Sequence, residues 1–248
     1  MLRRQFLLRL FISVLVVAAL VGGYFLYRKH AIDARRSVLV MAWLNDPESH
    51  SDWAIRAGER CGNAPFIFPT SGFIGYLWDD SFRINHRHQG IDIFGGDEPG
   101  KVAVLAAHPG YLTRLADWKS SLIIRLPQDP LYPQRQIWLY YTHLADLNGN
   151  SYIAPEFPPG THEFYVEAGT QLGYQGNYSG DPGHPTGVHL HFSIVLDDAS
   201  NPGHFLNELD IRNTLDPSPY FGLSLNANTN KGEVPVCPEE NAVVAISK

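Results

Sequence analysis

The longest hydrophobic run of this chain extends from Leu10 to Tyr27 without a charged residue, and arginines flank it at Arg9 and Arg28. At ~1.5 Å per residue, a helix over this run just crosses the ~30 Å hydrocarbon core of a bilayer. We therefore predict a cytoplasmic stub at residues 1–9 and an uncleaved transmembrane helix at residues 10–27. A cleaved signal peptide is the alternative, although no A-x-A-like cleavage site follows the run. Basic residues at both ends leave the orientation undecided.

The rest of the chain carries short apolar runs, each bounded by Gly, Pro, Asn or Asp, which is typical of β-strands. No amphipathic pattern long enough for a substantial helix lies between them, and 22 glycines and 18 prolines favour frequent turns. We predict an all-β domain at residues 61–222, a connector at residues 28–60 and a polar C-terminal tail at residues 223–248. The expected strands lie within residues 90–94, 102–107, 122–126, 137–141, 171–174 and 188–196.

Composition narrows the class of protein. A hydrophobic content of 44% over 248 residues is that of a folded chain, and the net charge of −6 argues against nucleic-acid binding. The two cysteines, Cys61 and Cys237, form no C-x-x-C motif, which argues against a thiolate zinc site. In an oxidising compartment they could form a disulfide that ties the tail to the domain, and two free buried thiols are the alternative.

The run from Gly187 to Ile194 alternates apolar and polar residues, as a half-buried strand does. Successive side chains of a strand point to opposite faces, so His189 and His191 share the face opposite the core. Two imidazoles on one rigid strand can form a metal site or an acid/base pair, or simply an exposed polar face.

A second cluster lies at residues 85–94, which we also expect to be a strand. There His88 and Asp92 have the same parity, and Gly90 between them leaves that face bare for a metal ion. His, Asp and one further His form an N,N,O set that suits Zn²⁺ and leaves one coordination position open, as in catalytic zinc sites. His143, in a third predicted strand, is by itself more often a structural histidine.

Together, the pieces His88-x-x-x-Asp92, Tyr141-x-His143-Leu144 and Gly187-x-His189-x-His191 resemble the LytM/lysostaphin-type (duplicated hybrid motif) zinc metallopeptidases, which are peptidoglycan endopeptidases. The resemblance covers roughly residues 62–222. It implies an antiparallel β-sheet domain with few short helices, and one Zn²⁺ per chain. It also implies the metal ligands His88, Asp92 and His191, the catalytic residues His143 and His189, and stem or cross-bridge peptides of peptidoglycan as substrate.

We therefore expect a membrane-anchored zinc endopeptidase on the extracytoplasmic side of a bacterial cytoplasmic membrane. The alternative is a non-hydrolytic module of the same family that activates another cell-wall hydrolase, which would require a regulatory protein partner. The long segment between His143 and Glu167 reads as an enlarged loop that narrows or covers the site. His86 and His184 are polar groups expected near it.

Overall fold

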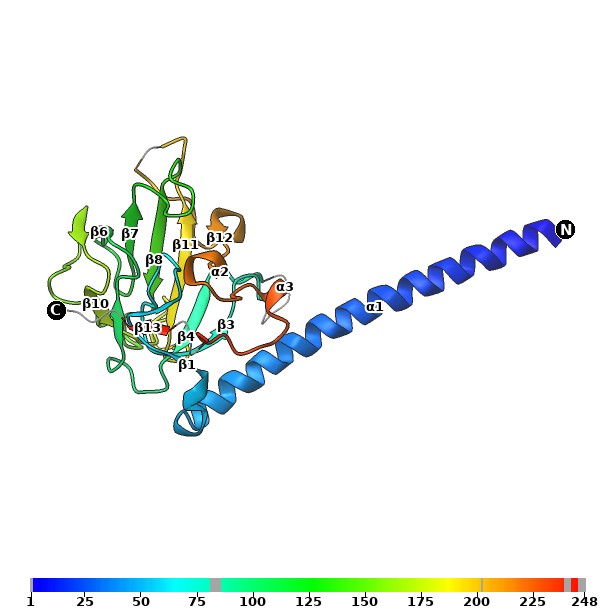
Figure 1. Ribbon diagram of the computed structural model, residues 1–248, viewed down its shortest axis with the longest axis horizontal. Helices are drawn as coiled ribbons and strands as arrows, with labels where there is room; N and C mark the ends of the chain where they lie inside the picture. The colour runs from blue at the N-terminus through cyan, green and yellow to red at the C-terminus, as the bar shows by residue number, and fades with distance from the viewer. Residues whose placement is uncertain (1, 81–85, 202, 239–241, 245–248) are drawn as a thin grey trace.

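The computed structural model describes residues 2–80, 86–201, 203–238 and 242–244. Its body is a mostly antiparallel β-structure from which one long N-terminal helix, α1 (Leu2–Asn45), extends as a rod, with the N-terminus at the far end (Figure 1). The predicted fold class is thereby confirmed. The other helices of the described residues are short: η1 (Glu48–Trp53), η2 (Ile211–Asn213), α2 (Ser218–Phe221) and α3 (Ala227–Asn230).

The main sheet has nine strands, and all their pairings are antiparallel. Its order is β1 (Ala54–Ile55), β3 (Gly72–Tyr76), β4 (Ile91–Phe94), β11 (Leu190–Leu196), β8 (Ile137–Thr142), β7 (Leu122–Leu126), β6 (Gly110–Thr113) and β9 (Phe164–Val166), with β12 (Thr214–Leu215) beside β11. Two small sheets pair β5 (Ala103–Leu105) with β10 (Gln171–Tyr174), and β2 (Glu59–Cys61) with β13 (Ala242–Val244). Each of the six predicted strand regions overlaps one of these strands, and only β8 extends beyond its predicted region, by one residue.

The core lies against one face of the main sheet. Leu190, Phe192 and Ile194 of β11 are completely buried, as the alternation of the sequence predicts. Phe192 contacts Tyr141 of β8 and Phe221 of α2 edge to face, so aromatic side chains fill the centre of the core.

The expected connector differs from the observed structure, because α1 continues unbroken to Asn45. Val40 and Trp43 of α1 are buried with Phe73 and Phe94, while Val38 and Met41 on other sides of the helix are exposed. Within the apolar residues 38–44, Val40 and Trp43 therefore form the stripe by which α1 packs on the sheet. The stretch Arg9–Tyr27 of the same helix is long and apolar enough to cross a membrane, and none of it is buried inside the fold.

The expected tail also belongs to the folded body. Leu225 and Asn230 are buried, and β13 pairs with β2. A disulfide joins Cys61 to Cys237 with a Cα–Cα distance of 5.3 Å. Hydrophobic periodicity does not reveal this segment, because it is held by capping, side-chain hydrogen bonds and a covalent bond.

Candidate metal and catalytic site

Three adjacent strands supply one row of residues across the sheet. In the register of β4, β11 and β8, Asp92 lies opposite His191, and His191 lies opposite Thr142. Directly opposed residues of antiparallel strands point to the same face with their Cβ atoms about 4.5–5.5 Å apart. Strand pairing therefore brings Asp92 to His191, although 99 positions separate them.

His88 does not lie on a strand, contrary to the prediction, since β4 begins only at Ile91. Backbone hydrogen bonds to Asp79 and Asp80 hold its loop, and its Nδ1–H donates to the carbonyl oxygen of Leu77 at 2.9 Å. The role expected for Gly90 is wrong as well. A Cβ on Gly90 would lie 2.1 Å from the carbonyl oxygen of Phe192, so this glycine lets the loop approach β11 and does not bare a face for a metal.

The three predicted ligands meet at one point. His88 Nε2 lies 3.1 Å from Asp92 Oδ1 and 3.0 Å from His191 Nδ1, and His191 Nδ1 lies 2.8 Å from Asp92 Oδ1. A carbonyl oxygen only accepts, so the bond to Leu77 places the proton of a neutral His88 on Nδ1 and leaves a lone pair on Nε2. The Nε2 lone pair of His88 thus faces Asp92 Oδ1 and His191 Nδ1 across about 3 Å. Such an arrangement is favourable only if a proton or a cation lies between these atoms.

This donor set fits zinc. Tetrahedral bonds of about 2.0–2.2 Å place ligand atoms roughly 3.3–3.6 Å apart. The three atoms here lie 2.8–3.1 Å apart, so a small outward movement of the side chains would seat the ion. Burial raises the pKa of Asp92, but His88 and His189 outweigh it and hold that pKa well below its usual range, so Asp92 is a carboxylate. Burial lowers the pKa of His191, which favours the neutral imidazole that a metal requires. The side chain of His191 is 13% exposed, so the site is open on one side.

The other two predicted residues lie beside this cluster. The Nδ1–H of His189 donates to the carbonyl oxygen of Gly187 at 2.7 Å, and that of His143 to Tyr178 at 2.6 Å. Both rings therefore keep a lone pair on Nε2, and their centroids are 4.5 Å apart. Burial first, and then the neighbouring imidazole of His189, lowers the pKa of His143 to about 3. His143 is thus a neutral imidazole that can accept a proton.

The backbone of His143 is strained. Its φ of 72° lies in the left-handed region, which costs a residue with a side chain about 1–3 kcal/mol and is common at functional sites. This conformation ends β8 at Thr142 and turns the histidine toward His189.

A cavity of about 630 Å³ opens onto these five residues. Besides the central strands, it is lined by the end of α1 through Val40 and Leu44, by a loop within residues 178–187, and by Glu208 and Leu209. The sequence did not point to the α1 residues as part of the site, because only the packing of the helix on β3 brings them there. The sequence signal for Val40 and Leu44 is the apolar stretch at residues 38–44, which lies inside the predicted connector.

The other polar residues expected near the site, His86 and His184, lie in different surroundings. His86 lines the cavity, whereas His184 pairs with Asp181 on the surface and its side chain is 80% exposed. The segment between His143 and Glu167 does not cover the site. Its residues Ile153 and Phe157 are buried in the core, and within the described chain none of its members lines the cavity.

No family model and no curated protein matches the sequence. The structure is similar to the antimicrobial peptidase lysostaphin from Staphylococcus simulans, at 19% identity over 68% of this chain and 55% of that chain, with a TM-score of 0.37. It is also similar to Csd3 from Helicobacter pylori, at 19% identity over 55% and 32%, with a TM-score of 0.36. A further similar structure is a mutant catalytic domain of the prophage-encoded protein EnpA from Enterococcus faecalis, at 17% identity over 60% and 93%, with a TM-score of 0.35.

These three solved structures are similar to the chain at 17–19% identity and over part of its length. The chain spans about half the length of lysostaphin and about a third of Csd3. The activity of this chain depends on the side chains of its own site.

Proposed function

We propose that this protein is a zinc-dependent endopeptidase that hydrolyses peptide bonds of bacterial peptidoglycan. The observation that carries this proposal is the convergence of five side chains in one cavity. Three of them, His88, Asp92 and His191, present ligand atoms within 3.1 Å of one another. The other two, His143 and His189, present Nε2 lone pairs beside them.

The chemistry divides between the ligand set and the two neighbouring histidines. A zinc ion held by His88, Asp92 and His191 would supply Lewis acidity to the scissile carbonyl and lower the pKa of a water molecule. The Nε2 atoms of His143 and His189 accept the proton of the attacking water and return a proton to the leaving amine. The carbonyl oxygens of Tyr178 and Gly187 hold both rings in the tautomer that this task needs.

The substrate class follows from the motifs. The order and spacing of the three motifs resemble those of peptidases that cleave stem or cross-bridge peptides of peptidoglycan. The cavity suits a peptide, because it is open and combines apolar side chains such as Val40 and Phe94 with hydroxyl groups such as those of Ser120 and Ser121.

Two features support an anchored protein outside the cytoplasm. The Arg9–Tyr27 stretch is apolar, unburied and continuous with the part of α1 that packs on the domain. A signal sequence would share the first two properties but would not need the third. The disulfide between Cys61 and Cys237 is typical of proteins in oxidising compartments, which include the bacterial periplasm and cell surface.

The full chain, purified in detergent, should bind about one zinc ion and release peptides from peptidoglycan sacculi. A chelator should abolish the release and added zinc should restore it, while Asp92→Asn should lower zinc content and peptide release together. Mass spectrometry of the products from defined muropeptides would identify the bond that is cut. Stoichiometric zinc without hydrolysis of several wall types would refute the enzyme and favour a module that regulates another cell-wall hydrolase.

A further inference from the structure

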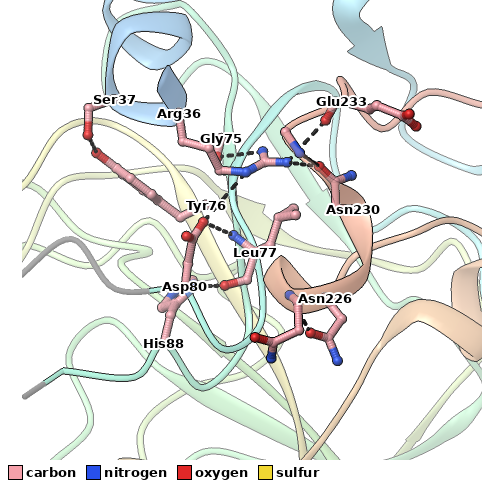
Figure 2. Close-up of polar contacts among 12 residues, drawn as sticks. Arg36, Ser37, Gly75, Tyr76, Leu77, Asp80, His88, Asn226, Asn230 and Glu233 are labelled. Carbon is pink, nitrogen blue, oxygen red and sulfur yellow. Dashed lines mark hydrogen bonds and ion pairs between the residues drawn. The ribbon is translucent and has the colours of Figure 1, made fainter. Parts of the chain in front are cut away.

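Arg36 of α1 is a buried cation close to the metal ligands. It is 1% exposed, and its ion-pair partner Asp80 is 2% exposed, with 3.7 Å between Arg36 Nε and Asp80 Oδ2. A buried charged side chain is rare unless it is paired and hydrogen-bonded. Figure 2 shows Arg36 leaving the helix and pointing toward Gly75, Asp80 and Asn230, which come from β3, from the turn after it and from the C-terminal segment.

The guanidinium of Arg36 joins three segments that are distant in sequence. Nη1 donates to the carbonyl oxygen of Gly75 at 3.1 Å, and Nη2 donates to Asn230 Oδ1 and to the carbonyl oxygen of Glu233. The register of β3 against β4 shifts between Ile74 and Tyr76, so Gly75 lies at an irregularity of the ladder. The carbonyl group that Arg36 binds is therefore at a place where the hydrogen-bond ladder between β3 and β4 is interrupted.

A second observation shows that the helix and this irregularity fit each other. A Cβ on Gly75 would lie 2.6 Å from Val40 Cγ2 and 2.7 Å from the ring of Phe94. The absence of a side chain at this position lets α1 lie directly on β3. Ser37, one residue after Arg36, also contacts Tyr76 by a hydrogen bond of 3.4 Å between the two hydroxyl groups.

The same contacts lead to the metal ligands. Asp80 Oδ2 accepts a hydrogen bond from the backbone N–H of Leu77, and the carbonyl oxygen of Leu77 accepts the Nδ1–H of His88. The carbonyl oxygen of Asp80 in turn accepts the backbone N–H of His88 at 2.8 Å. On the other side of the irregularity, Tyr76 lies opposite Asp92 in the sheet.

We propose that Arg36 is a positioning residue for the metal site. It fixes the Gly75 irregularity and the Asp80 turn, and through the Leu77 carbonyl it fixes the imidazole of His88. The part of α1 that follows the predicted membrane anchor thus positions a metal ligand, in addition to connecting the domain to the anchor. This inference rests on the proposed metal site, and its test measures metal binding rather than hydrolysis.

The test compares Arg36→Met with Arg114→Met in the full chain in detergent. Arg114 is a matched control, because it is 5% exposed and donates to Trp118, Ser151 and Phe157, none of which contacts a metal ligand in the described contacts. The zinc dissociation constant is measured by competition with a chromogenic chelator. The visible spectrum of the Co²⁺-loaded chain reports the geometry of the metal site, and thermal unfolding of the metal-free chain reports its stability.

We expect Arg36→Met to weaken zinc binding by about 10- to 100-fold, the range found when supporting partners of metal ligands are removed, and to alter the cobalt spectrum. Arg114→Met should lower thermal stability and leave both metal readouts unchanged. The double variant Arg36→Met/Asp80→Asn removes the unpaired buried charge, so it should regain stability but not zinc affinity. Arg36→Lys keeps the charge without the planar fork and should bind zinc with intermediate affinity.

Wild-type zinc affinity and an unchanged cobalt spectrum in folded Arg36→Met would overturn the inference. If Arg36→Met does not fold, wild-type zinc affinity and an unchanged cobalt spectrum in the double variant or in Arg36→Lys would overturn the inference. Failure of the unaltered chain to bind zinc would instead refute the proposed function.

Discussion

Gly90 offers a direct test of how the metal ligands are brought together. It lies between His88 and Asp92. A Cβ built on Gly90 would lie 2.1 Å from the carbonyl oxygen of Phe192, 2.8 Å from the carbonyl carbon of Phe192 and 2.9 Å from Ser193 Cβ, all in β11. The two carbonyl atoms belong to the backbone of Phe192, so they cannot rotate away. Gly90→Ala must therefore push the His88 loop and the start of β4 away from β11.

The size of this displacement sets the expected effect. Ordinary contact begins at 3.4 Å, so the backbones must separate by more than 1 Å at this point. Overpacking typically costs about 1–3 kcal/mol, and we expect about 3 kcal/mol here because backbone must move. For a chain of this size that lowers the melting temperature by roughly 6–12 °C. A zinc site tolerates ligand distances within about 0.2 Å, so zinc affinity should fall at least 10-fold.

The assay is thermal unfolding of the metal-free chain together with zinc titration, and Gly187→Ala is the control. Gly187 also lies next to the site, but a Cβ there would have its nearest contact at 3.6 Å, from a ring carbon of Phe94. Gly187→Ala should change neither the melting temperature nor the zinc affinity appreciably. If Gly90→Ala keeps the melting temperature and the zinc affinity of the unaltered chain, close packing of the His88 loop on β11 does not hold the ligands.

Three further predictions concern the neighbouring histidines and the disulfide. His143→Gln and His189→Gln should each lower kcat by about 10²–10⁴-fold while zinc content stays near one per chain, and loss of zinc in either would contradict their assignment as proton carriers. Burial and His189 hold the pKa of His143 at about 3, so the folded chain keeps this ring neutral while the unfolded chain protonates it below ~6.5. The free energy of unfolding of the metal-free chain should therefore fall as the pH drops from 6.5 towards 3. The loss from this ring is at most ~1.4 kcal/mol per pH unit, and less because the ring is partly exposed. Urea unfolding of His143→Gln at pH 6.5 and 5 should show a smaller loss, and an equal loss would refute the reasoning. Reduction, or replacement of Cys61 and Cys237 by serine, opens a loop of 176 residues and should cost up to about 5 kcal/mol, measured as a lower urea midpoint. An unchanged midpoint would show that the crosslink does not stabilise the fold.

The strands could be predicted from sequence because their hydrophobic residues alternate along a core face or form short apolar runs between turn residues. The region at residues 171–174 coincides with β10 and that at residues 122–126 with β7. The pattern failed for the end of α1, where Arg36, Val40 and Trp43 form a narrow buried stripe among the side chains that the structure describes. Such a stripe is too short to show a helical period, so its role depends on the sheet surface that receives it.

The five candidate site residues could be named from the sequence, because the motifs that contain them resemble those of the LytM/lysostaphin-type peptidases in order and spacing. The tautomers of His88, His189 and His143, by contrast, depend on which carbonyl oxygen each imidazole ring contacts. Leu77, Gly187 and Tyr178 supply those oxygens, and backbone geometry after folding decides their positions.

The sequence by itself determined the β-rich class, the apolar span at residues 10–27 and the residue types available to the candidate site, since these follow from local periodicity and composition. The tertiary structure decided what joins these parts. The register of β4, β11 and β8 places Asp92 beside His191, and the packing of α1 on Gly75 places Arg36 near Asp80. Contacts between distant segments depend on shape and pairing in three dimensions, and no window of sequence contains both partners.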